Sequence, residues 1–192
     1  MGGVNQDEGK KVLVIRFSAI GDVVLTSPII RALKLAGFQV DYVVKEKFKN
    51  AIENNQNIDK LFTLEQEALK EELLTQKYSL VVDLQNNLKS LRLRKGLSQN
   101  IRVVNKENIK KLLLVRTGID LLHNQHIVER YFKAIHDLGL EDDGKGLDFF
   151  IPDDFKIDAE SIPLDLSKPY LAWAIAASYP KKILPMEHII RT

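Results

Sequence analysis

The chain has 192 residues, a formal net charge of +2, and 45% hydrophobic and 28% charged residues, a composition typical of a soluble globular protein. It contains no cysteine, which excludes disulfides, thiolate metal sites and a cysteine nucleophile. No apolar run approaches the roughly 18 residues of a membrane span, and the N-terminus lacks the apolar core of a secretory signal. We therefore expect a cytoplasmic protein.

Apolar runs typical of strands alternate with helical patterns along most of the chain. Strands are predicted at residues 11–17, 38–44, 60–64, 78–84 and 101–104. Helices are predicted within residues 22–36, 45–54, 65–76, 88–95 and 126–138, while 110–115 is ambiguous. This alternation predicts an α/β fold with a Rossmann-like parallel sheet and helices on both faces. Ligands of such sheets bind at the carboxyl ends of the strands.

The first helix has two possible starts, because Pro28 cannot lie inside an unbent helix. Either Ser27 caps a helix whose first residue is Pro28, or the helix begins at Asp22 and bends at Pro28. In both cases Gly21 and Asp22 lie at the end of the first strand.

Asp22 follows a glycine in the loop after the first strand. This loop is neither a Walker loop nor a dinucleotide fingerprint, because the glycine and lysine spacing of those motifs is missing. Backbone N–H groups at a helix start can still receive a phosphate, and a carboxylate there stays ionised, as a general base requires. Asp22 is therefore a candidate catalytic base. The alternative is that it only caps the helix.

A second polar loop, residues 83–87, ends the predicted strand 78–84. Its side chains are expected to face the same crevice as Asp22, where Gln85 and Asn86 could hydrogen-bond sugar hydroxyls. Equally, Asn86 could simply cap the next helix.

The four histidines suggest no metal site. His123 and His126 lie three residues apart, and Glu129 is the nearest acidic neighbour, so too few ligands are present for a closed site. His126 is expected to lie at a helix start, facing the cleft or solvent.

Basic residues are concentrated in segment 86–116, where only Glu107 opposes them. The nine are Lys89, Arg92, Arg94, Lys95, Arg102, Lys106, Lys110, Lys111 and Arg116. Such a block indicates an anionic partner, which could be a phosphorylated small molecule, an acidic glycolipid or nucleic acid. Solvated helix faces that happen to be basic are the alternative.

From residue 151 onwards the composition changes. Prolines and acidic residues up to Pro169 are typical of a linker, and they precede a predicted strand, loop and helix start. The expected organisation is a polar tail over 1–10, a Rossmann-like domain over 11–155, a linker over 156–169 and the beginning of a truncated second α/β domain over 170–192. In the predicted loop of that second domain, Lys181 and Lys182 could bind a diphosphate or form a solvated pair.

The segment RFSAIGDVVLTSPIIRALK resembles the N-terminal motif of the family 9 glycosyltransferases, the ADP-heptose:lipopolysaccharide heptosyltransferases. The matching positions are Ser18, Gly21, Asp22, Thr26 and Pro28. Three later segments also resemble family motifs, in the expected order. They are Val82-Asp83-Leu84-Gln85 with Leu88-Lys89-Ser90, then His126 with Val128-Glu129-Arg130, then Lys182-Ile183-Leu184-Pro185 with Glu187, where Leu184 replaces the tryptophan of the motif.

The resemblance implies a GT-B fold of two Rossmann-like domains, with the acceptor on the N-terminal domain and the nucleotide-sugar on the other. It also implies inverting transfer of heptose from ADP-heptose to core lipopolysaccharide, without a metal or other cofactor. Asp22 would deprotonate the acceptor, Ser18 and Gly21 would contact donor phosphate, and Lys182 would steady the departing diphosphate. Acceptor binding is assigned to polar and basic residues: Gln85, Asn86, Lys89, Arg92, Arg94 and His126.

Family members carry a full second domain, so this 192-residue form is expected to be weakly active or inactive alone. The expected partners are an ADP-heptose-like donor and an anionic glycolipid, with no nucleic acid. Such a protein of a bacterial cytoplasm could contact the inner face of the inner membrane. The alternative is a noncatalytic anion-binding α/β module that uses the basic segment 86–116.

Overall fold

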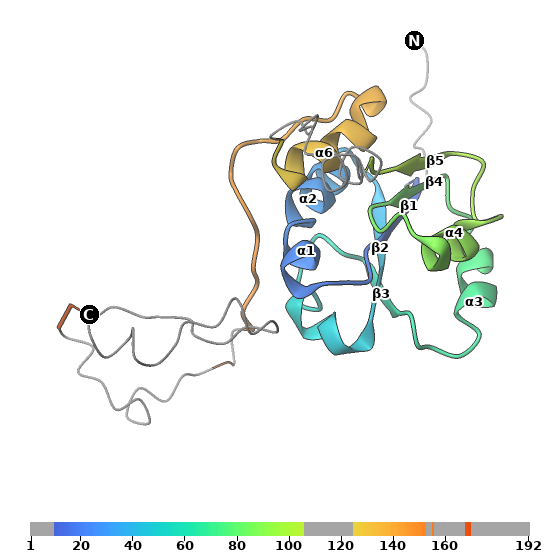
Figure 1. Ribbon diagram of the computed structural model, residues 1–192, viewed down its shortest axis with the longest axis horizontal. Coiled ribbons are helices and arrows are strands. Elements are labelled where there is room, and N and C mark those ends of the chain that lie inside the picture. The colour runs from blue at the N-terminus through green and yellow to red at the C-terminus, as the bar shows by residue number, and fades with distance from the viewer. Residues whose placement is uncertain (1–9, 106–124, 153–154, 156–167, 170–192) are drawn as a thin grey trace, which may run out of the picture. The chain divides into compact units, whose positions relative to one another are not determined.

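The computed structural model describes residues 10–105, 125–152, 155 and 168–169. The chain divides into two compact units, Met1–Pro152 and Asp153–Thr192, and the helices and strands given below all belong to the first (Figure 1). The predictions made for residues 110–115 and 170–192, including Lys182, lie outside the described residues.

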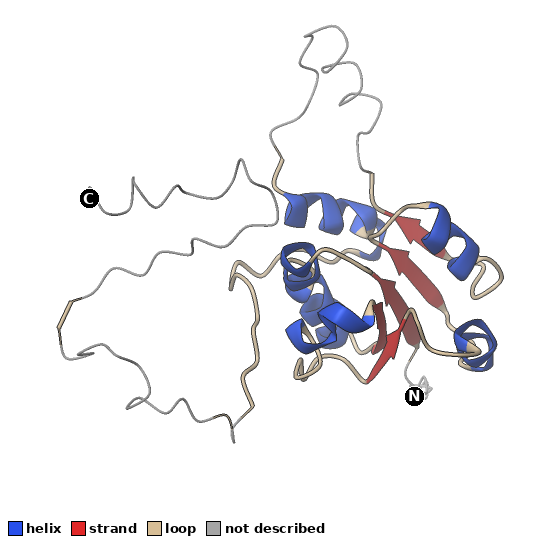
Figure 2. Cartoon of the chain, turned by 60° about the horizontal axis from the view of Figure 1, so that its bottom comes forward, coloured by secondary structure: helices blue, strands red, loops and turns tan. Residues whose placement is uncertain are grey.

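Five parallel strands form one sheet in the order β3-β2-β1-β4-β5, side by side in Figure 2. The parallel α/β sheet expected from the sequence is therefore confirmed, with each strand somewhat shorter than predicted. The strands are β1 (Lys11–Ile15), β2 (Gln39–Val44), β3 (Lys60–Thr63), β4 (Leu80–Asp83) and β5 (Ile101–Val103).

The central strand β1 is buried on both faces, because its side chains alternate between two hydrophobic cores. Val12 and Val14 belong to the core under α2 (Ser27–Leu35) and α6 (Ile127–Ala134). Leu13 and Ile15 belong to the core under α3 (Leu69–Thr75) and α4 (Leu88–Arg94). Figure 1 shows these two pairs of helices on opposite sides of the sheet.

The chain after β1 forms two helices, α1 (Ile20–Val24) and α2, and so differs from both starts expected for a single helix. The break falls at Thr26, which is the N-cap of α2, and Pro28 lies in the first turn of α2, where a missing N–H removes no helical bond. Thr26 is buried and donates its hydroxyl to the Val23 carbonyl at 2.6 Å. Gly37, with φ +86°, follows α2 as predicted.

Three further helical segments differ in detail from the prediction. Residues Glu46–Ala51 form a 3-10 helix, η1, in place of a longer helix. Asn87, and not Asn86, caps α4, since its side chain accepts the Ser90 N–H at 2.9 Å. The last predicted helix is split into α6 and the 3-10 turn η2 (His136–Leu138), which Gly139 ends.

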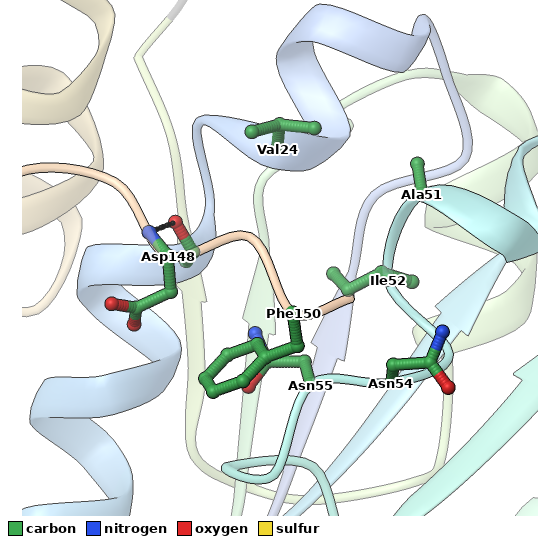
Figure 3. Close-up of a pocket in the computed structure, with 8 residues that line it drawn as sticks. Val24, Ala51, Ile52, Asn54, Asn55, Asp148 and Phe150 are labelled. Atoms are coloured by element: carbon green, nitrogen blue, oxygen red, sulfur yellow. Dashed lines mark hydrogen bonds between the residues drawn. The ribbon is translucent and has the colours of Figure 1, made fainter. Parts of the chain in front are cut away.

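The segment after η2 is fastened to α2 by one buried arginine. Arg31 donates to both carboxylate oxygens of Asp143, at 2.9 and 2.6 Å, and forms a second ion pair with Asp148 at 2.5 Å. The Asp148 N–H also donates to the Ser27 hydroxyl at 2.9 Å (Figure 3). The cavity beneath this segment measures about 10 Å³, which is no larger than one water molecule needs, so it offers no ligand site.

Candidate active site

The candidate site lies where β1 and β4 end side by side. From β1 the chain continues to β2 and β3 in one direction, whereas β4 and β5 lie on the other side of β1. The carboxyl ends of β1 and β4 therefore flank the topological switch point of the sheet, the place where open α/β folds bind their ligands.

The loops that follow these two strands are joined to each other by buried hydrogen bonds. Arg16 donates from Nη1 to the Leu84 carbonyl at 2.7 Å, and the Phe17 N–H donates to Gln85 Oε1 at 2.9 Å. Residues 68 positions apart in sequence thus share one rigid surface, because each loop completes the hydrogen bonding of the other.

Asp22 lies on this surface, and one of its two carboxylate oxygens is bound by other residues. Its Oδ2 pairs with Arg16 Nη2 at 2.5 Å and accepts the Ala19 N–H at 3.3 Å. The Arg16 side chain is 8% exposed and that of Asp22 is 38% exposed. Among the described residues none donates to Oδ1, so one oxygen is oriented and the other is available to a ligand. The capping interpretation thus holds for one oxygen only, and the long distance from Ala19 makes it a weak cap.

A buried tyrosine of α6 lies in the electrostatic field of this pair. Tyr131 is fully buried, and its pKa is raised to about 12, mainly by burial, with Arg16 opposing the rise and Asp22 adding to it. Its hydroxyl is therefore neutral at physiological pH and keeps its proton. Within the described residues, neither this hydroxyl nor Arg16 Nε has a hydrogen-bond partner.

Asp83, the carboxylate at the end of β4, is fully buried and fully engaged. Its Oδ1 accepts the N–H groups of Gln85 and Asn86 at 2.9 and 2.7 Å, and its Oδ2 accepts Arg94 Nη1 at 2.8 Å. Asn86 adopts a positive φ of +42° and donates its amide to the Val104 carbonyl at 2.8 Å. These contacts shape the loop around Asp83, and they occupy Arg94.

The other predicted site residues lie in different places. Ser18 and Gly21 flank the start of α1 beside Asp22, and a Cβ at Gly21 would meet nothing within 4 Å. His126 is the exposed N-cap of α6, with Nδ1 accepting the Val128 N–H at 3.4 Å. Among the described residues, Asp22 forms polar contacts with Arg16 and Ala19 and not with His126.

Lys89 and Arg92 lie away from the Asp22 carboxylate, on α4. Together with Leu64, Lys70 and Leu93 they line an open groove of about 480 Å³ between α3 and α4. The structure thus brings Ser18, Gly21, Asp22 and Gln85 together around the switch point, and it places the two basic residues on the outer side of the domain.

Sequence reasoning missed Arg16. Its signal was available, because a charged residue directly after a wholly apolar strand must find a partner if the fold buries it. Among the described residues no group of three histidine, aspartate or glutamate side chains could hold a metal ion, and no helix is long and apolar enough to cross a bilayer.

Comparison with known proteins decides the family. The model of glycosyltransferase family 9 (heptosyltransferase) matches residues 66–189. The chain belongs to glycosyltransferase family 9. It is 26% identical over 137 residues to lipopolysaccharide heptosyltransferase 1 of Campylobacter coli, a match that covers 63% of the chain and 39% of that relative.

Solved structures of the family share the fold. A family 9 glycosyltransferase from Veillonella parvula superposes with a TM-score of 0.70 at 19% identity, covering 95% of the chain and 58% of that protein. The E. coli heptosyltransferase WaaC with ADP gives a TM-score of 0.55 at 23% identity, covering 72% of the chain and 50% of WaaC. The chain therefore spans less than two thirds of the length of each of these relatives.

Proposed function

We propose that this chain carries the acceptor side of an inverting, metal-independent glycosyltransferase that moves heptose from an ADP-heptose-like donor to an anionic core-lipopolysaccharide acceptor. Membership of family 9 and the name of the Campylobacter coli relative support the reaction class. The observation that carries the mechanism is the Asp22 carboxylate, with Oδ2 held by Arg16 and Oδ1 available at the switch point.

Asp22 acts as the general base. The acceptor hydroxyl transfers its proton to Oδ1 while its oxygen bonds to the anomeric carbon of the donor. The bond between that carbon and the diphosphate oxygen breaks, and the nucleoside diphosphate leaves with the electron pair. A single displacement inverts the anomeric configuration and needs no covalent enzyme intermediate.

The donor is proposed to approach the start of α1. Ser18 and Gly21 would offer backbone N–H groups to its phosphates, and Lys182 would balance the charge that grows on the leaving diphosphate. In this proposal residues 11–155 form the acceptor domain, 156–169 the linker and 170–192 part of the nucleotide-sugar domain. The structures of WaaC with ADP and with ADP-2-deoxy-2-fluoro heptose support the choice of donor class.

The acceptor is proposed to lie along the loop after β4 and the basic residues beyond it. Gln85 and Asn86 would contact sugar hydroxyls with the polar atoms that their loop contacts leave available. The charges for acceptor phosphates and carboxylates would come from Lys89, Arg92, Arg94 and His126, although Arg94 would have to share its guanidinium with Asp83. Such an acceptor is anchored in lipid, so we place the protein in the cytoplasm with peripheral contact to the inner membrane.

The test is Asp22→Asn, assayed for transfer from ADP-heptose by the protein that carries this chain. Loss of the base is expected to lower kcat by a factor of about 10²–10⁴. The matched control is Asp137→Asn, because Asp137 is 39% exposed and also pairs with an arginine, Arg102, at 2.5 Å. Full turnover by Asp22→Asn would contradict the assignment of the base.

A noncatalytic anion-binding module is the second candidate, and the basic groove of α4 is the observation that favours it. Binding of nucleic acid would weaken steeply with salt and would not respond to a nucleotide-sugar. Binding that responds to ADP-heptose would exclude this alternative.

A further inference from the structure

Helix α4 has two opposite faces. Its inner face packs on the sheet through the buried Ser90 and Leu93, and Arg94 on the same side pairs with Asp83. Four exposed residues form what we call the α4 outer face: Leu88, Leu91, Arg92 and Lys95. They follow the spacing i, i+3, i+4 and i+7, so they share one side of the helix.

Two large apolar side chains on this face are exposed to solvent. Leu88 is 73% exposed and Leu91 is 48% exposed. Neither is needed to start the helix, because Asn87 and Ser90 cap it reciprocally, with both bonds at 2.9 Å. Single exposed leucines are common, but here two of them alternate with cations on a helix of two turns.

The charge of α4 is of one sign. Residues 88–95 include four basic residues and no acidic one. Asp83 neutralises Arg94, whereas the exposed side chains of Lys89, Arg92 and Lys95 have no partner among the described residues. Three available cations therefore surround the two leucines.

The groove beside this face also combines apolar and basic side chains. Leu64 and Leu93 supply its apolar lining and Lys89 and Arg92 its basic lining, and Lys70 donates to the Leu93 and Lys95 carbonyls at the end of α4. Burial lowers the pKa of Lys70. The exposed Glu71 of α3 opposes this lowering electrostatically.

We propose that the α4 outer face docks on an anionic lipid bilayer, with Leu88 and Leu91 entering the interfacial layer and Arg92 and Lys95, together with Lys89 beside the face, contacting lipid phosphates. Basic residues interleaved with leucines on one helix face are typical of helices that lie in a bilayer interface. The proposal rests on the proposed function and deepens it, since a lipid-anchored acceptor must be reached at a membrane surface.

Two other occupants fit less well. Single-stranded nucleic acid is bound by aromatic stacking platforms, whereas the apolar residues here are aliphatic. A specific protein partner needs an interface of about 1,200–2,000 Å² in total, and two helical turns offer only part of one side of it. A bilayer has no such minimum, because each cation and each apolar side chain adds to the affinity separately.

The position of the face suits this role. Leu88 follows directly after the loop 84–87, which is hydrogen-bonded to the loop of Asp22 through Arg16 and Gln85. Docking through α4 would therefore hold the acceptor side of the site beside the membrane.

The experiment is co-sedimentation of the 192-residue chain with vesicles of phosphatidylglycerol and phosphatidylcholine, and with vesicles of phosphatidylcholine alone. We expect binding to the anionic vesicles that weakens with salt. Leu88→Gln/Leu91→Gln should reduce it by about tenfold or more, and Lys95→Gln by about fivefold. The matched control is Leu35→Gln, because Leu35 is also 73% exposed but lies at the end of α2, across the sheet. Unchanged binding by the double variant, or an equal loss in the control, would overturn the proposal.

Two further measurements separate this surface from the catalytic proposal. Asp22→Asn should bind the vesicles like the wild type, whereas the leucine variants, made in the protein that carries this chain, should keep transfer to a lipid-free fragment of the acceptor. Circular dichroism checks that each variant is folded, and light scattering measures the oligomeric state. If the leucine changes alter self-association and leave vesicle binding intact, the face is a contact between copies and the membrane assignment is wrong.

Discussion

The ends of β1 and β4 present the same chemistry in two different states. Each has an aspartate that pairs with an arginine: Asp22, in the helix after β1, with Arg16 at 2.5 Å, and Asp83, the last residue of β4, with Arg94 at 2.8 Å. Asp83 is fully buried, and both its oxygens accept hydrogen bonds from its own loop and helix. Asp22 is 38% exposed and has one oxygen available. In the Asp22 pair it is the arginine that is buried, so the protein fixes the Asp22 carboxylate and leaves it accessible.

The largest effect that tests this contrast is on stability. Asp83→Ala should lower the free energy of unfolding by about 3–5 kcal/mol, because it leaves Arg94 without its ion-pair partner and two loop N–H groups without acceptors. Asp22→Asn should change it by no more than about 1 kcal/mol, since the amide oxygen can still accept from Arg16 and half of the pair is solvated. Urea denaturation measures the free energy of unfolding of both variants. Equal losses of stability would show that the two aspartates do not differ in their contribution to the fold.

Replacement of Arg16 should separate positioning from folding. Arg16→Gln is expected to lower kcat by about 10–100-fold with little change in KM for the donor, because Oδ2 of Asp22 is no longer held. Arg16→Lys should restore part of kcat, since an ammonium can pair with one oxygen but cannot also reproduce the bond to Leu84.

The control for that series is Arg102→Gln, which breaks the exposed pair with Asp137. Its kcat should equal that of the wild type. A kcat that follows thermal stability across all three variants would show that Arg16 acts through folding alone.

Gly21 allows a smaller test of the space beside Asp22. It lies inside α1, and a Cβ there meets nothing within 4 Å, so Gly21→Ala should raise the free energy of unfolding by about 0.5–1 kcal/mol. If donor phosphate approaches the start of α1, the added methyl should raise KM for the donor. A stabilised variant with an unaltered KM for the donor would show that the donor phosphate does not bind beside Gly21.

Asp143 gives the smallest expected effect and adds a third Arg–Asp pair to the comparison. The side-chain bond from Arg31 lowers the pKa of Asp143 from 3.8 to about 2. Because the folded value lies below the ordinary one, the stabilisation is present above pH 3.8 and is lost as the pH falls towards about 2. Urea titrations between pH 5 and pH 2, about the range of the two pKa values, should show this loss in the wild type but not in Asp143→Asn. The same slope in both proteins would assign the acid transition to other carboxylates.

Much of the fold follows from the sequence, because the apolar runs of the strands are nearly continuous and are buried on both faces, as in β1 and β4. Helix starts were less certain. Neighbouring residues such as Asn86 and Asn87 have equal capping propensity. In the structure Asn86 adopts a positive φ, and Asn87 is the residue that caps α4.

The site was predictable only in part. Asp22 and Asp83 look alike in sequence, and their difference depends on Arg94, which folds back from 11 residues further on. The side of α4 on which each cation lies follows from helical spacing, which puts Arg94 with Ser90 and Leu93 and apart from Arg92. Arg16 could not be assigned from local sequence, since its partner Leu84 lies 68 residues away.

The place of β1 in the sheet has a consequence for the lifetime of the site. β1 is hydrogen-bonded on both sides, to β2 and to β4, whereas among the described strands β3 and β5 are each paired on one side only. Amide protons of Val12 to Ile15 should therefore be among the slowest to exchange, while transient opening begins at the edges. Arg16, which pairs with Asp22, is the next residue after this strand. The edge strands can therefore open many times before the geometry at Asp22 is lost.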